Sequence, residues 1–499
     1  MLDNFSKTFK LNHKGNIYAI GDIHGDIIPL IICLRDCCNV IKKKSNVILK
    51  KEVYNFNQNK IDADLNYQME KSWNNSTFVD HLNYEWCGKN AYVVFCGDLL
   101  DNVRGPIKKK PGEFPFEEAR IFKFINAINK QAMKQGGRLF KVLGNHDMYN
   151  LNGRVKTSYS SYVSQYAQNY DGYKKNGAKG RLDYFGKGKP GAKLIGEDGA
   201  YLFLMINDFI FVHGGISTSS IDVDNIEQVN ESLMKYIYDI SKNNVFDVKT
   251  NNIENSLTFS NGDDDGLVKD RYFGFVDEKT EKEMCTTLYN KFVIICRDIK
   301  KKYNDISQEN KNICNPNKMK LVIGHCNQNK ITSDSNKIFK SGFSQLVHYD
   351  EDKQFIEEYT APVFKGEPSK KTGIYGITVS CGDKDIDKYL DKDIDKYLEI
   401  NFNKPSIFRL DVGMSRGFNL METDSEFEEY ILSRTPQVLK IIYKELNDPH
   451  ISVIKSSYQN TMIHLTELDN NPYKDKYKKY KSKYNYIKQN LINNGVIIN

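Results

Sequence analysis

Five apolar segments of this chain end with glycine beside a side chain that can bind a metal ion. They run into GDIHGD (residues 21–26), GDLLD (97–101), GNHD (144–147), HGG (213–215) and GH (324–325). Each apolar run has the length of a buried strand, and glycine permits a tight turn after it. Side chains at the carboxyl ends of neighbouring strands gather at one edge of a sheet. The pattern therefore predicts an α/β fold with one shared site.

The donors at these strand ends form a mixed oxygen and nitrogen set without thiolate. They are Asp22, His24, Asp98, Asn145, His213 and His325. Such a set suits Mn, Fe or Zn better than Ca or Mg. Six protein ligands are too many for one ion that must keep an open position. The set therefore predicts two divalent transition-metal ions bridged by one carboxylate.

Two such ions would leave the site electropositive, so a phosphate group is the natural guest. A water held between the ions would be acidified and aimed at phosphorus. The leaving oxygen then needs a proton, and His146, next to Asn145, is the candidate general acid. Asp101 is available to orient it. Arg104 and Arg271 are the candidate phosphate-binding residues, because guanidinium groups bind phosphate with paired hydrogen bonds.

The bulk composition is that of a protein with a sizeable core. The chain has 499 residues, 40% of them hydrophobic, and a formal net charge of +7. No run of about 18 apolar residues predicts a membrane span, and the start lacks the apolar middle of a signal peptide. We therefore expect a cytoplasmic, reducing setting and no membrane partner. The ten cysteines form no C-x-x-C pair, which predicts free, partly buried thiols.

Periodicity outlines the remaining elements. Helical spacing predicts a helix from residue 27 that ends in the basic turn IKKK (41–44), and another over 117–137. Residues 436–456 read as two strands joined by a polar turn. The polar segment 46–84 is predicted to be an insertion. So is 365–400, which contains the tandem repeat KDIDKYLD–KDIDKYLE and reads as a solvated surface segment.

The motifs GDIHGD, GDLLDNVRG, GNHD, VHGG and GH resemble, in this order, the signature of calcineurin-like metallophosphoesterases. The stretches EWCGKNAYVVFCGDLLD, QGGRLFKVLGNHDMYNL and FRLDVGMSRGF are similar to the phosphoprotein-phosphatase branch, and within it to the bacterial-like, Shewanella-like phosphatases. The resemblance covers about residues 16–457. It implies a four-layer α/β/β/α sandwich of two mixed β-sheets flanked by helices, with a catalytic domain over 12–457 and the insertions outside it.

The resemblance also implies a role for each matched residue. Asp22 and His24 would hold the first metal, and Asp98 would bridge the two metals. Asn145, His213 and His325 would hold the second metal. His146 would be the general acid, with Asp101 as its partner.

The sequence departs from the family pattern at two places. The family usually has arginine directly after the second acid of the GDxxD block, whereas here Asn102 and Val103 precede Arg104. The family usually has glutamate after the catalytic histidine, and here the residue is Asp147. The stretch DDDGLVKDRYFG (263–274) matches the region that supplies the second phosphate-binding arginine, which implies that role for Arg271.

The resemblance favours a phosphomonoesterase acting on phosphoprotein, at serine, threonine or tyrosine. The same centre would also suit nucleotides, dinucleoside polyphosphates or phosphodiesters. A non-enzyme alternative is a catalytically silent, metal-binding scaffold.

The C-terminal segment 468–499 interleaves tyrosine with lysine. Such a segment would bind single-stranded nucleic acid by phosphate contacts and stacking, or would be a solvated helix. It resembles tails of giant DNA virus proteins, which implies a virion contact, and a place in the virion or host cytoplasm if the chain is viral.

Overall fold

The computed structural model describes the chain from residue 9 to residue 455, with gaps. The described residues are 9–44, 81–101, 118–152, 182–218, 221–240, 258, 266–274, 281–303, 314–326, 329–330, 345–349, 355–360, 374–375, 378–381, 405–412, 414, 436–445 and 448–455. The chain divides into two units, Met1–Ser456 and Ser457–Asn499, and all described residues belong to the first. The tail 468–499 and Arg104 therefore lie outside the described residues.

The first sheet has five strands in the order β17-β16-β2-β5-β6. Its parallel strands are β2 (Ile17–Ile20), β5 (Tyr92–Cys96) and β6 (Arg138–Val142). β16 (Gln437–Glu445) pairs antiparallel with β2 and forms a hairpin with β17 (Asp448–Lys455). The two strands predicted over 436–456 are thus confirmed.

The second sheet has six strands in the order β1-β7-β8-β9-β15-β14. They are β1 (Lys10–Leu11), β7 (Leu204–Ile206), β8 (Phe209–Phe211), β9 (Lys320–Ile323), β15 (Ser406–Arg409) and β14 (Thr378–Ser380). β8, β9 and β15 run parallel to one another, and β14 is antiparallel to β15. β7 is antiparallel to β8 but parallel to β1. The strands β2, β5, β6, β7, β8, β9 and β15 are mostly apolar and buried, as expected for strands that are covered on both faces of a sheet.

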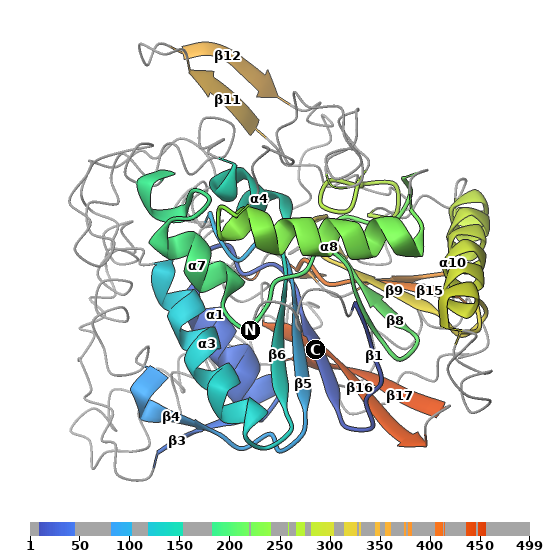
Figure 1. The fold of residues 1–499 in the computed structure, drawn as a ribbon, viewed down its shortest axis with the longest axis horizontal. Coiled ribbons are helices and arrows are strands. Elements are labelled where there is room, and N and C mark those ends of the chain that lie inside the picture. Colours follow the sequence, from blue (N-terminus) through green and yellow to red (C-terminus); the bar gives the residue numbers. More distant parts are fainter. Residues whose placement is uncertain are drawn as a thin grey trace, which may run out of the picture. The chain divides into compact units, whose positions relative to one another are not determined.

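Helices flank both sheets (Figure 1). They are α1 (Ile27–Ile32), α3 (Ala119–Met133), α4 (Asn145–Leu151), α7 (Pro190–Gly196), α8 (Val223–Ile237) and α10 (Glu281–Tyr303). α3 packs against β6 and α7, and α8 contacts α7 and α10. The predicted sandwich of two mixed β-sheets flanked by helices is confirmed.

Three short pairs of strands lie outside the two sheets: β3 (Ile41–Lys43) with β4 (Tyr84–Trp86), β10 (Asn329–Lys330) with β13 (Ile374–Tyr375), and β11 (Gln345–Tyr349) with β12 (Phe355–Thr360).

The prediction that IKKK ends a helix is wrong. The helix α1 continues as a π-helical turn over Cys33–Cys37, and the chain then turns at Asn39, whose φ of 52° ends helical geometry. Ile41 is buried and pairs with Trp86 in β4, so burial of a β-branched side chain outweighs the basic pattern. The end of the predicted insertion 46–84 also belongs to the fold, since a 3₁₀ turn at His81–Asn83 leads into β4.

The segment 365–400 is not wholly an insertion either. Thr378–Ser380 forms β14, the edge strand that pairs antiparallel with β15. Two of its three residues are β-branched, which favours a strand. The tandem repeat after it lies outside the described residues.

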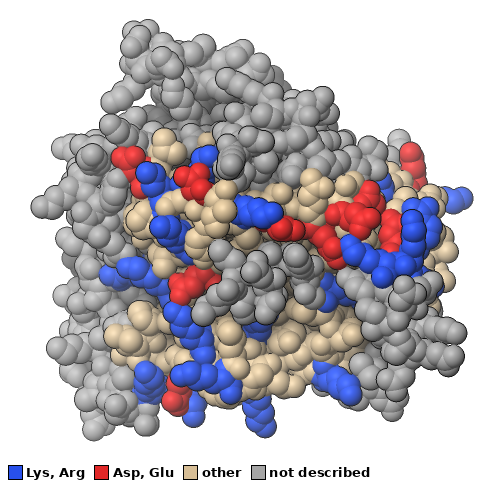
Figure 2. Space-filling model, in the orientation of Figure 1, with Lys and Arg blue, Asp and Glu red and all other residues tan. Residues whose placement is uncertain are grey.

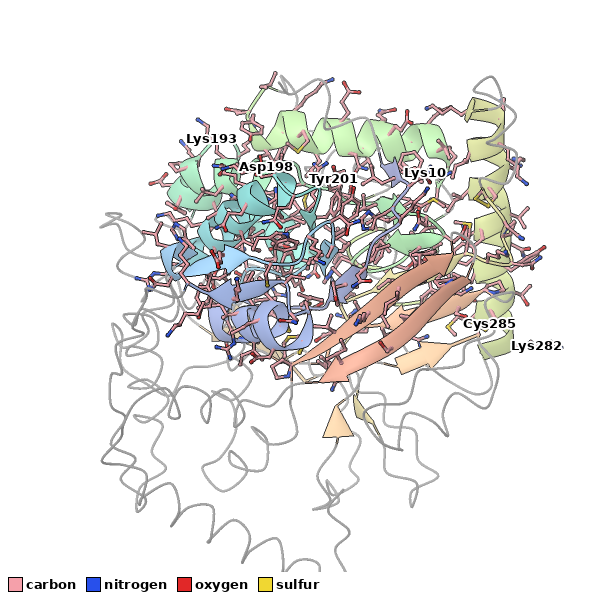
Figure 3. The ribbon with its side chains drawn as sticks, turned by 90° about the horizontal axis from the view of Figure 1, so that it is seen from below. Lys10, Lys193, Asp198, Tyr201, Lys282 and Cys285 are labelled. Carbon is pink, nitrogen blue, oxygen red and sulfur yellow. A yellow bond between two sulfur atoms is a disulfide. The ribbon has the colours of Figure 1, made fainter. Side chains whose placement is uncertain are left out.

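Four cysteines form two disulfides, so the prediction of free thiols is wrong for them. Cys285 in α10, labelled in Figure 3, pairs with Cys381 after β14, and Cys296 pairs with Cys314. The partners are 96 and 18 residues apart, so no local spacing reveals them. Disulfides are typical of oxidising compartments, so the pairing does not support the reducing setting that we expected.

Each helix in the described part of the chain is too short or too polar to span a lipid bilayer. Acidic and basic side chains mix on the face shown in Figure 2. Where α8 meets α10, Lys302 pairs with Asp224 and Glu227. Among the described residues on this face, basic side chains are thus interspersed with acidic ones.

Lys141, in strand β6 of the first sheet, is a buried lysine. The Lys141 ammonium in β6 donates to Asn126 Oδ1 (2.8 Å) and to the backbone oxygen of Glu197 (2.5 Å). Asp198 and Tyr201 are labelled in Figure 3, and the backbone N–H of Tyr201 donates to the backbone oxygen of Lys141 (2.9 Å). Burial lowers the pKa of Lys141 to about 7, although the charges of Asp198 and Glu197 oppose the shift.

This buried lysine predicts a pH-dependent stability. Between pH 7 and about 10 the unfolded chain keeps Lys141 protonated while the folded chain releases the proton. The unfolded state then binds more protons, so the free energy of unfolding rises with pH. Urea unfolding should show the wild type gaining stability relative to Lys141→Met across this range. A difference that does not change with pH would contradict the assignment.

Candidate metal centre

The predicted strand ends meet where the two sheets come together. β2, β5 and β6 bring the GDIHGD, GDLLD and GNHD segments from the first sheet, and β8 and β9 bring HGG and GH from the second. The sequence pattern predicted one shared edge, whereas the structure builds the site from the edges of two sheets. Its buried members are Asp22, His24, Asp98, Asn145, His146 and His213, with His325 half-buried.

The Asp98 carboxylate lies at the centre of the site. Its Oδ2 atom is 3.3 Å from His213 Nε2, 3.7 Å from His24 Nε2 and 4.0 Å from His146 Nε2. Its Oδ1 atom accepts a hydrogen bond from the backbone N–H of His146 (2.9 Å). One carboxylate oxygen therefore faces imidazoles that come from both sheets.

Backbone carbonyls orient two of these imidazoles. Nδ1 of His213 donates to the oxygen of Cys96 (2.8 Å), and Nδ1 of His24 lies 3.3 Å from the oxygen of Leu100. A carbonyl only accepts hydrogen bonds, so it keeps the proton on Nδ1 and leaves Nε2 as the ligand atom. In both residues Nε2 is the atom that faces Asp98.

Asn145 and Asp22 place two further oxygens in the site. Asn145 Oδ1 lies 3.0 Å from His213 Nε2, so this nitrogen faces two acceptor oxygens, an arrangement that suits a cation between them. Asp22 Oδ2 lies 3.7 Å from His24 Nε2 and accepts a bond from the backbone N–H of His325 (3.1 Å). The Asp22 carboxylate therefore connects the first strand end to the last.

These side chains form two groups that could each hold a metal ion. Asp22, His24 and Asp98 make one group, and Asp98, His213 and His325 make the other, with the potential ligand atoms of each group within 4.8 Å of one another. Asp98 belongs to both. Nε2 of His325 is buried and has no hydrogen-bond partner among the described residues, which fits a role as a metal ligand.

Several site residues have strained backbones. His24, Asp98, Asp101 and His325 have φ values of 43°, 47°, 65° and 66°. Non-glycine residues rarely adopt this left-handed conformation, and such strain clusters at functional sites where the surrounding structure enforces it. The tight turns after the strands thus turn these side chains into the site at a conformational cost.

Two glycines allow the turns to approach each other. A Cβ atom on Gly97 would overlap the ring of His213, and one on Gly144 would overlap the carboxylate and backbone of Asp98. The absence of these side chains lets the HGG and GNHD loops lie directly against the GDLLD loop.

His146 makes a buried pair with Asp101. The His146 Nδ1–H donates to Asp101 Oδ2 at 2.8 Å, and the ring of His24 stands edge-on to the ring of His146, with 5.2 Å between the centroids. The pair leaves Nε2 of His146 directed toward the Asp98 side of the site.

The electrostatics of the site brings two donors, Asp98 and His325, close to their ligand forms. For His213, burial lowers the pKa but the charge of Asp98 outweighs it and raises the pKa. Burial raises the pKa of Asp98, but the charges of His213, His146 and His24 outweigh it and hold the pKa well below its usual value. Burial lowers the pKa of His325, and repulsion by His213 and Arg271 lowers it further. Asp98 is therefore ionised and His325 neutral at neutral pH, which are the forms that bind metals.

Only one of the two predicted phosphate-binding arginines can be placed. Arg271 lies close enough to His325 and Cys326 to act on both side chains by its charge. Burial is the larger effect on each: it lowers the pKa of His325, which Arg271 lowers further, and it raises the pKa of Cys326, which Arg271 opposes. It follows Asp270, whose carboxylate accepts from the backbone N–H groups of Ser217 (2.6 Å) and Tyr272 (2.8 Å). Asp270 thus fastens the loop that carries Arg271 to the loop after the HGG segment.

Sequence reasoning assigned no role to three buried supporting residues: Asp147, Asn150 and Asp270. Asp147 accepts from the backbone N–H groups of Leu99, Leu100 and Gly144 (3.0, 3.0 and 2.9 Å) and ties two strand-end loops together. Burial, with the charge of Asp98, raises the pKa of Asp147 to about 7. Asn150 carried a usable signal, since it lies four residues after His146 and a helix places such residues on one face.

Residues 15–325, more than half of the chain, match the model of the calcineurin-like phosphoesterase family. The chain therefore belongs to this family of phosphoester hydrolases, and the resemblance seen in its motifs is confirmed.

Among curated proteins, an uncharacterised protein of Schizosaccharomyces pombe is 30% identical over 159 residues, covering 30% of this chain and 32% of the relative. Shewanella-like protein phosphatase 1 of Plasmodium berghei is 25% identical over 291 residues, covering 57% of this chain and 59% of the relative. The chain thus spans less than two thirds of either relative.

Among solved structures, the cold-active protein-tyrosine phosphatase of a psychrophilic Shewanella species covers 64% of this chain and 68% of its own, with 18% identity and a TM-score of 0.37.

The close approach at Gly144 gives a direct test of the geometry. In Gly144→Ala the new methyl group must displace Asp98, so we expect metal affinity to fall by at least roughly tenfold, as when a residue that supports a ligand is lost. Isothermal titration with Mn²⁺ measures this. In the control Gly136→Ala the new Cβ meets only Asn90, at 3.8 Å. That variant should lose stability but keep metal affinity, and equal affinities in the two variants would contradict the geometry.

Proposed function

We propose that this protein is a metal-dependent phosphatase that hydrolyses phosphomonoesters, chiefly phosphoserine, phosphothreonine or phosphotyrosine in proteins. The observation that carries the proposal is the position of Asp98. Its Oδ2 atom faces imidazoles from both sheets, and the residue is shared by both groups of candidate ligands. A shared carboxylate is what a two-metal hydrolytic centre requires.

The residues fit two divalent ions. Asp22, His24 and Asp98 would hold one of them. Asp98 would also serve the second, together with Asn145, His213 and His325. The donor chemistry suits Mn, Fe or Zn, and the orphaned His325 Nε2 supports the fit. Divalent ions bound there would lower the pKa of a water and offset the charge of a phosphate.

The protein's own side chains would supply the proton and the substrate contacts. His146 is held by Asp101 through Nδ1, so its Nε2–H can be given to the oxygen that leaves phosphorus. Arg271, near the last strand end, would hold outer phosphate oxygens with paired hydrogen bonds. Arg104 stays a prediction for the same role.

The preference for phosphoprotein rests on similarity to the Plasmodium protein, which is named a protein phosphatase. Dinucleoside polyphosphates and phosphodiesters are the alternative substrates, because the same centre could hydrolyse them. A catalytically silent scaffold is the non-enzyme alternative, and it predicts metal binding without turnover.

A substrate panel tests the proposal. With Mn²⁺ added, the purified chain should hydrolyse phosphopeptides faster than a dinucleoside polyphosphate or a bis-aryl phosphodiester, and a chelator should abolish turnover. Asp98→Asn keeps a residue that tolerates left-handed backbone but removes the charge, so its activity should fall by more than roughly a hundredfold. Asp36→Asn, outside the site, is the matched control. Turnover that survives chelation would refute the metal-dependent mechanism.

The proposed general acid predicts a dependence on the leaving group. His146→Ala should lower kcat by roughly 10²–10⁴-fold for a phosphoserine peptide, and much less for p-nitrophenyl phosphate, whose leaving group needs no proton. Metal content by mass spectrometry should not change. His13→Ala removes another buried histidine, one that stacks on Tyr92 outside the site, and should show no such selectivity. Equal losses for both substrates in His146→Ala would exclude the acid role.

A further inference from the structure

Asn150 is buried in α4, one helical turn after His146. Its amide nitrogen has two hydrogens and directs them to two acceptors. One is Asp101 Oδ1 at 3.0 Å, and the other is the backbone oxygen of His146 at 2.8 Å. Asn150 therefore contacts both members of the His146–Asp101 pair.

The two oxygens of Asp101 have different donors. Oδ2 accepts from His146 Nδ1 (2.8 Å), while Oδ1 accepts from Asn150 (3.0 Å). Asp101 itself lies in the loop after β5 with a φ of 65°, so neither a helix nor a strand fixes its side chain. Since the carboxylate can rotate about its Cβ–Cγ bond, a donor on the second oxygen sets its plane.

The same amide anchors the helix that carries the imidazole. Because the second hydrogen of Asn150 goes to the backbone oxygen of His146, the donor is fixed relative to His146 and not only to Asp101. A shift of the Asp101 loop against α4 would break the bond between Asn150 and Asp101. Asn150 thus links the loop after β5, which carries Asp101, to the helix α4 after β6, which carries the proton donor His146.

We propose that Asn150 is a positioning residue that acts through Asp101 on the proton-donating imidazole of His146. This inference rests on the proposed function. In the step concerned, a hydroxide oxygen derived from water forms a bond to phosphorus while the bond between phosphorus and the leaving oxygen breaks. The electron pair of the broken bond stays on the leaving oxygen, which takes the Nε2 proton of His146. His146 is left neutral, with its Nδ1–H still donated to Asp101. Asn150 holds the carboxylate in the plane that keeps this proton on Nδ1.

The test compares substrates with poor and good leaving groups. Asn150→Ala should lower kcat for a phosphoserine peptide by roughly 10–100-fold, the usual effect of losing a residue that orients a functional histidine. It should lower kcat for p-nitrophenyl phosphate far less, and metal content and KM should stay close to wild type. Asn150→Asp, which keeps the size of the side chain but places an oxygen against Asp101, should show the same selectivity and serves if the alanine variant does not fold.

A matched control removes a buried asparagine elsewhere. Asn230 in α8 donates to the oxygen of Phe203 (2.8 Å) and accepts from the N–H of Leu202 (2.8 Å). Asn230→Ala should lower thermal stability without changing the ratio of the two substrates' kcat values. If Asn230→Ala and Asn150→Ala change that ratio equally, the effect of Asn150 is general destabilisation and the inference is overturned.

A double-mutant cycle separates this inference from the proposed function. If Asn150 acts through Asp101, Asn150→Ala should cost little further activity once Asp101→Ala is present. Independent, multiplying losses would overturn the inference while leaving the function intact. Selectivity in His146→Ala without selectivity in Asn150→Ala would do the same. If His146→Ala itself shows no selectivity, the general-acid assignment is wrong and the inference falls with it.

Discussion

The contact between the Asp98 carboxylate and the imidazoles around it is the interaction on which the site depends. His24 reaches Asp98 from the first sheet and His213 from the second, at 3.7 and 3.3 Å. A buried carboxylate is costly without partners, and here nearby imidazoles keep it ionised. The position of one side chain therefore requires that both sheets meet at the ends of β5 and β8.

The surrounding structure provides that position at a conformational cost. Asp98 and His24 adopt left-handed backbone conformations, and Gly97 and Gly144 lack the side chains that would separate the loops. Hydrogen bonds from three backbone N–H groups to Asp147 hold the two loops of the first sheet together. Strain at the site is thus offset by buried polar contacts next to it, as is common at functional sites.

Much of this architecture follows from the sequence because its signals are local. The apolar runs before Gly21, Gly97 and Gly144 predict the parallel strands of the first sheet, and the helix predicted over 117–137 corresponds to α3. The features that sequence reasoning missed depend on distant partners. Ile41 becomes part of a strand only because Trp86 pairs with it.

The disulfides and the supporting residues of the site also depend on partners that are distant in the sequence, so local patterns did not predict them. Cys285 finds Cys381 across 96 residues, and the carboxylates of Asp147 and Asp270 accept hydrogen bonds from backbone groups, which leave no trace in side-chain patterns. The motifs predict which residues gather, whereas the geometry among them comes only from the fold.

The most direct test of the account is the number and place of the metal ions. Crystals grown with Mn²⁺ should give two anomalous-scattering peaks in each molecule. Asp98 should contact both, with Asp22 and His24 at one peak and Asn145, His213 and His325 at the other. A single peak, or peaks that Asp98 does not share, would contradict the claim that this carboxylate joins two metal ions across the two sheets.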